Sequence, residues 1–134
     1  MSYLGGATLV VDDYDRAISY FVDTLGFKLI EDTQMGDGKR WVVIAPEIGK
    51  GATLLLAKAT NDSQRAAIGN QTGGRVSYFL YTQNFDQDYL RFSNKGVQFL
   101  AQPRMEEYGK VVVFTDLYGN KWDFIEKPSE AISE

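Results

Sequence analysis

The 134-residue sequence contains no cysteine and no histidine. Without cysteine, the chain cannot use disulfides, thiolate nucleophiles or zinc–sulfur sites. Without histidine, it lacks the commonest metal-binding side chain and the commonest general base near neutral pH. Any metal or proton-transfer chemistry must therefore depend on carboxylates, hydroxyls, amines and guanidinium groups.

Long apolar runs and basic clusters are also missing. No stretch is long and apolar enough to span a bilayer, and no basic-then-apolar leader is present, so we expect a cytoplasmic protein that does not engage membranes. The net charge of −4 and the lack of a Lys/Arg cluster argue against nucleic acid as a partner. The length predicts a single domain over residues 1–134.

The first half of the chain predicts one helix among four strands. Residues 7–11 form an apolar run, and Asp12-Asp13 offers a helix N-cap directly after it. The positions that recur at helical spacing after this cap are Tyr14, Ile18, Phe21 and Leu25. Gly26 is expected to end the helix with a positive φ. Three further strands are predicted at residues 27–30, 40–45 and 52–57, with a turn at residues 35–38 between the first two.

The second half repeats this order. A strand is expected at residues 77–81, followed by a helix capped by Asn84, with Gln87 completing a partial capping box. The strands expected after the helix are residues 97–100, 110–115 and 121–126. The helix faces of the two halves align at an offset of 71, and the strands align at 70 and 69. We therefore predict a duplicated βαβββ unit, with module one at 3–58, a linker at 59–74 and module two at 75–127.

The stretch 116–124 reads as a β-hairpin whose turn contains Gly119-Asn120. In the returning strand Asp123 lies between Trp122 and Phe124. Because strand side chains alternate, Asp123 is expected to face away from the core if the two aromatic residues face it.

The motifs that carry a family resemblance are Val11-Asp12-Asp13-Tyr14-Asp15-Arg16-Ala17-Ile18, Leu25-Gly26-Phe27 and Phe114-Thr115-Asp116-Leu117-Tyr118-Gly119-Asn120-Lys121-Trp122-Asp123. Together with the duplicated unit, they resemble the vicinal oxygen chelate superfamily, which includes glyoxalase I, bleomycin-resistance proteins and extradiol dioxygenases. The resemblance implies an α+β fold in which duplicated βαβββ modules form an open, curved mixed sheet with helices on the convex side. It also implies a pocket on the concave side and a homodimer.

The resemblance also indicates where a metal centre would lie. Metal-dependent members place ligands on the first and fourth strands of each module, and the alignment brings these positions to Gly6, Leu54, Ser77 and Asp123. One carboxylate and one hydroxyl do not make a catalytic metal site. We therefore expect no metal and no cofactor.

Asp123 is the candidate catalytic residue or ligand anchor. An acid among apolar neighbours has a raised pKa, which suits proton transfer. The alternative is a solvated acid paired with Lys121, Arg40 or Arg104. The candidate ligand-binding residues combine guanidinium groups for a carboxylate with rings for stacking: Arg40, Tyr78, Arg104, Tyr108 and Phe114. Surface solvation or core packing is the alternative role for each of them.

Three functions remain open, and the sequence does not decide whether the protein is an enzyme. The first is a binding protein of the bleomycin-resistance kind that holds a small aromatic or cationic molecule in a metal-free pocket. The second is a metal-independent lyase or isomerase with Asp123 as general base. The third is a lactoylglutathione-lyase or dioxygenase-type metalloenzyme, which would need acids such as Glu31, Asp32, Glu106 and Glu126 to converge.

Overall fold

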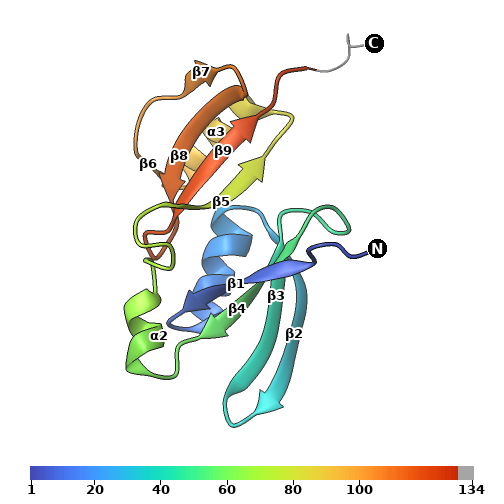
Figure 1. Cartoon of the computed structure of the whole chain (residues 1–134), viewed down its shortest axis with the longest axis vertical. Coiled ribbons are helices and arrows are strands. Elements are labelled where there is room, and N and C mark those ends of the chain that lie inside the picture. Colours follow the sequence, from blue (N-terminus) through green and yellow to red (C-terminus); the bar gives the residue numbers. More distant parts are fainter. Residues whose placement is uncertain (130–134) are drawn as a thin grey trace. The chain divides into compact units, whose positions relative to one another are not determined.

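The computed structural model describes residues 1–129, and the chain divides into two compact units, the first formed by Met1–Gln71 and the second beginning at Thr72. Each unit contains one mixed β-sheet with a helix packed on it (Figure 1). The α+β class is confirmed, because both units combine short helices with mixed sheets.

The first unit is built from β1 (Gly6–Val11), α1 (Tyr14–Ile18), the π-helical turn η1 (Ser19–Thr24), β2 (Lys28–Gly36), β3 (Lys39–Ala45), β4 (Thr53–Lys58) and α2 (Asp62–Ala67). Its strands lie in the order β1-β4-β3-β2, with β1 parallel to β4 and the other pairs antiparallel.

The second unit is built from β5 (Val76–Tyr81), α3 (Phe85–Asn94), β6 (Gln98–Phe99), β7 (Arg104–Glu106), β8 (Gly109–Thr115) and β9 (Lys121–Glu126). Its strands lie in the order β5-β9-β8-β6, again with one parallel pair, β5 and β9, while β7 pairs with β8. The two units thus share a strand order, as the repeated sequence pattern predicts.

The helix signals of the first unit act as expected. The Asp13 carboxylate accepts a hydrogen bond from the backbone N–H of Arg16 at 2.8 Å, which caps α1. Gly26 ends the helical segment with a φ of 79°. Between these ends, Tyr14 and Phe21 turn inward and are buried.

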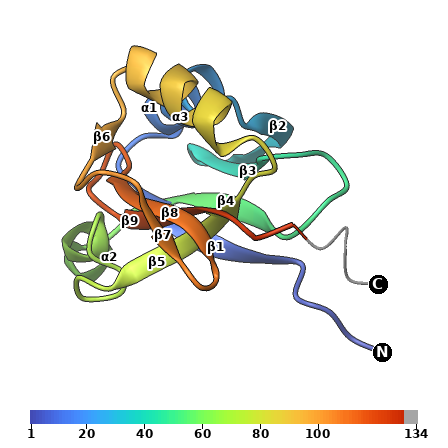
Figure 2. The same cartoon turned by 90° about the horizontal axis from the view of Figure 1, so that it is seen from above.

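The core of the second unit is a cluster of aromatic rings between α3 and the sheet. Phe85 and Phe92 of α3 lie 5.0 and 5.2 Å, centroid to centroid, from Phe124 of β9. Figure 2 shows α3 above β8 and β9. Trp122 is 3% exposed, so its predicted core position is confirmed.

Two local predictions are corrected, and one short strand is added. Asn84 precedes α3, but its side chain makes no capping bond, and the Phe85 N–H instead donates to the Glu126 carboxylate at 2.7 Å. The β2–β3 hairpin turns on Asp37-Gly38 alone, both with positive φ, so β2 runs to Gly36. The strand β7 was not predicted, because its three residues are all exposed and show no apolar alternation.

Candidate functional site

The turn before β9 is organised by a buried acid, Asp116, which is 6% exposed. Its carboxylate accepts hydrogen bonds from the backbone N–H of Tyr118 at 2.9 Å, the backbone N–H of Asn120 at 3.1 Å and the indole Nε1–H of Trp122 at 2.9 Å. Gly119 supplies the positive φ, at 95°. This network fixes the turn and the start of β9, and so determines which side of the sheet Asp123 faces.

Asp123 lies on the sheet face opposite to the core. It pairs with Val113 of β8 and with Phe79 of β5, while Trp122 and Phe124 on either side of it are buried. Asp123 itself is half-buried. Burial raises the pKa of this carboxyl, and the nearby Arg104 partly opposes the shift. We call this side the Asp123 face and define it by Phe79, Tyr81, Asp123 and Ile125.

A β-bulge decides which aromatic residue stands beside Asp123. The β5–β9 register shifts between Val76 and Tyr78, so Tyr78 pairs with Trp122 and its ring lies 4.6 Å from the indole. Tyr78 therefore lies on the opposite side from Asp123. Phe79 takes the place that was predicted for Tyr78, and it is 58% exposed. A bulge of one residue reverses every following side chain, and the sequence carries no clear signal for it.

Arg104 and Tyr108 come together near the Asp123 face. Arg104 Nε donates to the Glu106 carboxylate at 2.6 Å, and Arg104 Nη2 donates to the Tyr108 hydroxyl at 3.3 Å. The bond to Glu106 is the main cause of the raised pKa of Arg104. Of the residues predicted for the site, the second unit thus groups Asp123, Arg104 and Tyr108.

Arg40 belongs to the first unit and is held by two acids there. Its guanidinium forms ion pairs with Asp15 at 2.9 Å and with Asp32 at 2.7 Å, and it lies 5.2 Å from the centre of the Tyr14 ring. The hydrogen bond from Arg40 lowers the pKa of Asp32. These contacts fit a structural role, with the guanidinium joining the helix region to β2.

Phe114 is fully buried. Its ring contacts those of Phe92, Phe99 and Trp122, with centroid separations of 5.8, 6.2 and 5.7 Å. It therefore packs the core of the second unit and has no surface to offer a ligand. Strand alternation places it beside Trp122 rather than beside Asp123.

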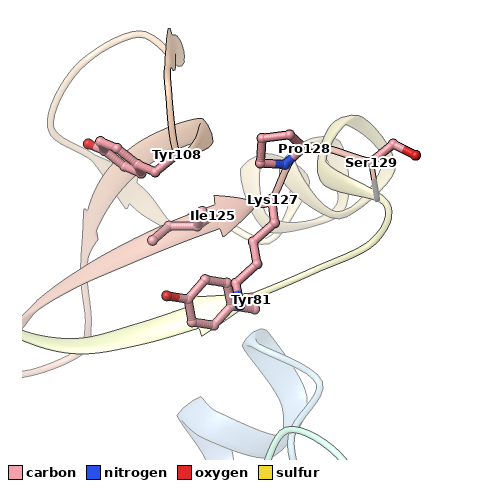
Figure 3. A pocket seen from close by; sticks show the side chains of 6 residues that line it. All are labelled: Tyr81, Tyr108, Ile125, Lys127, Pro128 and Ser129. Carbon is pink, nitrogen blue, oxygen red and sulfur yellow. The ribbon is translucent and has the colours of Figure 1, made fainter. Parts of the chain in front are cut away.

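Each unit has a hollow on the sheet face away from its helix. In the second unit a pocket of about 370 Å³ is lined by Tyr81, Tyr108, Ile125, Lys127, Pro128 and Ser129 (Figure 3). In the first unit a smaller hollow of about 310 Å³ is lined by Gly6, Ala7, Thr8, Trp41, Val43, Thr53 and Leu55. Sequence reasoning missed Lys127, Pro128 and Ser129, because they follow the last strand.

Four positions were aligned with the metal-ligand positions of metal-dependent members, and the strand register corrects one of them. Val43 pairs with Leu55, and its counterpart Val113 pairs with Asp123, so the residue equivalent to Asp123 is Leu55 and not Leu54. At Gly6 an added Cβ would lie 2.9 Å from the Thr53 carbonyl oxygen, too close for a side chain without a backbone shift. A glycine, a leucine, a serine and one aspartate do not fit a catalytic metal ion.

The four acids considered as examples for a displaced metal site have other partners. Glu31 accepts a hydrogen bond from the Thr33 hydroxyl, Asp32 pairs with Arg40, Glu106 pairs with Arg104, and Glu126 accepts from the Phe85 N–H. Within residues 1–129, no group of three His, Cys, Asp or Glu side chains is placed to hold a metal ion. None of the helices in this part of the chain combines the length and hydropathy needed to cross a membrane.

Three comparisons place these features among known proteins. A protein of Shewanella frigidimarina (strain NCIMB 400), described only as uncharacterized, is 50% identical over 119 residues, covering 88% of each chain. A solved glyoxalase/bleomycin resistance protein/dioxygenase superfamily member from Sphaerobacter thermophilus is 27% identical, covers 95% of this chain and 98% of its own, and has a TM-score of 0.72.

TnmS3, an antibiotic-binding protein from Streptomyces sp. CB03234, is 25% identical, with coverage of 96% of this chain and 98% of its own and a TM-score of 0.76. The model of the Glyoxalase/Bleomycin resistance protein/Dioxygenase superfamily matches residues 3–124. The resemblance noted in the sequence is confirmed, and the chain belongs to the Glyoxalase/Bleomycin resistance protein/Dioxygenase superfamily.

Proposed function

We propose that this protein binds a small organic molecule on the Asp123 face without the help of a metal ion. The observation that carries the proposal is a half-buried carboxylate beside two large, exposed rings: Phe79 is 58% exposed and Tyr81 is 54% exposed. Exposed rings gathered around one oriented polar group are typical of small-molecule sites. TnmS3, which is described as antibiotic-binding, supports this class of function.

Asp123 is the polar anchor in this proposal. An ionised carboxylate among apolar neighbours is poorly solvated, so a ligand hydroxyl or amine that donates a hydrogen bond to it restores part of the lost solvation. The rings of Phe79 and Tyr81 offer stacking surface to the planar part of the ligand. Neither interaction requires a metal ion, which the residues at the four compared positions do not fit.

The proposal is tested by screening planar compounds with amine or hydroxyl groups for thermal stabilisation and then measuring affinity by calorimetry. Asp123→Asn is expected to weaken a confirmed ligand by about tenfold, because a charge-assisted hydrogen bond becomes a neutral one. Glu47→Gln, which makes the same chemical change at an exposed position, should leave the affinity unchanged. Equal affinity of wild type and Asp123→Asn would contradict the anchor role.

A second candidate is a metal-independent lyase or isomerase. It is favoured by the raised pKa of Asp123, which suits a general base, and by the adjacent Arg104–Tyr108 hydrogen bond, which places donors where an oxyanion could develop. The same variant separates the two functions. If a confirmed ligand is also converted, Asp123→Asn should lower kcat by at least about a hundredfold; an unchanged kcat would remove Asp123 as the base.

We also propose, from the family resemblance, that the chain forms a homodimer and acts in the cytoplasm. The exposed aromatic and aliphatic side chains on its sheets support an association of this kind.

A further inference from the structure

The pocket in Figure 3 continues the Asp123 face toward the end of β9. Ile125 follows Asp123 by two residues, so both side chains point to the same side of the strand. Tyr81 pairs with Ile125 across the β5–β9 ladder, just as Phe79 pairs with Asp123. The face therefore runs from a carboxylate at Asp123 to a pocket that Lys127 borders.

The walls of this pocket suit an aromatic ring. Tyr81 is 54% exposed and Tyr108 is 51% exposed, while Ile125 between them is only 4% exposed and supplies an apolar floor. In Figure 3 the two tyrosine rings lie on different sides of Ile125. The volume of about 370 Å³ is enough to seat an aromatic system of about one or two fused rings.

Lys127 brings a positive charge to this pocket. The Lys127 ammonium lies 4.8 Å from the centre of the Tyr81 ring. Within residues 1–129, no carboxylate forms an ion pair with Lys127. Tyr108 accepts a hydrogen bond from Arg104, which brings a second cation to the rim, although Glu106 already pairs with Arg104.

This arrangement disfavours a cationic occupant. The ring face of Tyr81 nearest to Lys127 already carries an ammonium group, and a second cation there would be repelled. An anion is instead favoured, because Lys127 offers three hydrogen-bond donors and a positive charge that forms no ion pair with a carboxylate within residues 1–129. An anionic ligand group placed at the other end of the face would lie beside the Asp123 carboxylate and would be repelled by it.

We propose that the pocket formed by Tyr81, Tyr108, Ile125 and Lys127 binds a planar aromatic carboxylate, with the ring against the two tyrosines and the carboxylate on Lys127 Nζ. This inference rests on the proposed small-molecule function and names the ligand class for one end of the same face. The ring contributes burial and stacking, and the ion pair selects an acid over the corresponding neutral molecule.

The test compares 2-naphthoate with its neutral analogue 2-naphthamide, titrated into the full-length protein and followed by amide ¹H–¹⁵N NMR. We expect 2-naphthoate to bind more tightly, to shift the amide signals of Tyr81, Ile125 and Lys127, and to weaken as the salt concentration rises. Lys127→Met should lower the affinity for 2-naphthoate by about fivefold, the upper range for an ion pair at an exposed lysine, without changing the affinity for 2-naphthamide.

Two variants serve as controls. Lys50→Met removes the same charge from an exposed loop of the first unit and should change neither affinity. Tyr81→Leu should weaken both compounds alike, because it removes ring surface and leaves the charge difference between acid and amide intact.

The ligand class is overturned if 2-naphthamide binds as tightly as 2-naphthoate, or if Lys127→Met weakens both compounds equally. In either case the proposed function stands, since an aromatic molecule still binds this face. If 2-naphthoate shifts none of the pocket signals while a planar amine binds beside Asp123, the inference fails and the proposed function is supported. If no planar acid, amide or amine binds, both are contradicted.

Discussion

Asp116 illustrates how one buried acid can fix the strand that carries Asp123. It lies in the turn of the β8–β9 hairpin and receives hydrogen bonds from two backbone N–H groups and from the Trp122 indole. Removing the carboxylate would take this acceptor away from all three donors in the folded state. Turn geometry and the inward orientation of Trp122 thus depend on the same side chain.

We predict that Asp116→Ala lowers the free energy of unfolding by about 2–4 kcal/mol, because several buried or partly buried donors lose their acceptor. Asp116→Asn should cost less, since the amide oxygen retains part of the acceptor capacity. Urea unfolding, read as the change in midpoint at constant m-value, measures both. Glu47→Ala is the control at an exposed acid; an Asp116→Ala cost no larger than that of the control would contradict the role.

At the scale of elements, β2 is an edge strand that is exposed along its whole length. Arg40 of β3 donates two hydrogen bonds to the Asp32 carboxylate in β2, at 3.1 and 2.7 Å, and also pairs with Asp15 of α1. The Arg40 side chain is 16% exposed and that of Asp32 is 29% exposed. Because the pair is partly shielded from water, it is worth more than the fully solvated ion pairs of this chain.

We predict that Arg40→Gln lowers the free energy of unfolding by about 1 kcal/mol at pH 7 and speeds hydrogen exchange in β2. Arg40 lowers the folded-state pKa of Asp32 from 3.8. The stabilisation is therefore present above that value and is lost as the pH falls through the lower, folded-state pKa. The difference between wild type and variant should shrink in strong acid.

The control for this prediction is Arg65→Gln, which breaks an ion pair with Asp62 whose side chains are 57% and 102% exposed. It should leave the unfolding free energy nearly unchanged. Exchange in β2 that is as slow in Arg40→Gln as in wild type would show that the strand does not need this ion pair.

Regular periodicity made most elements predictable. The alternation around Asp123 correctly placed Trp122 inside, and the helical spacing that ends at Gly26 correctly placed the first helix. The errors lie where a single residue breaks a period. The bulge in β5 exchanged Tyr78 for Phe79, and a one-residue difference in β4 exchanged Leu54 for Leu55. Such register choices are set by hydrogen bonding across strands, which a single sequence does not display.

Contacts between charged side chains were the second feature that the sequence did not predict. Composition pointed to Arg40 and Arg104 as equal candidates, yet Arg40 is committed to Asp15 and Asp32, whereas Arg104 lies close enough to Asp123 to influence its pKa. Lys127 was missed because it follows the last predicted strand and belongs to no motif. Side chains that define a pocket rim come from loops and strand ends, where sequence periodicity carries no information.

On the scale of the whole molecule, the two units share a strand order, and both leave large apolar side chains exposed on their sheets. Trp41 in the first unit is 41% exposed, and Phe79 in the second is 58% exposed. Exposed rings in this number are costly for a monomer in water, since every Å² of apolar surface left exposed forgoes about 25 cal/mol. They are expected to be covered by a ligand, by a second copy of the chain, or by both.

We predict that the purified protein is a homodimer at micromolar concentration, with twice the chain mass of 15.1 kDa in light scattering after size exclusion. Burial of apolar surface drives the association. A charge at the ring that lies in the interface, introduced by Trp41→Glu or Phe79→Glu, should therefore shift the equilibrium to monomer. Lys50→Glu, in an exposed loop, should not. A ligand-bound protein that remains at 15.1 kDa up to tens of micromolar would show that the small molecule alone covers these rings, and the dimer proposal would fail.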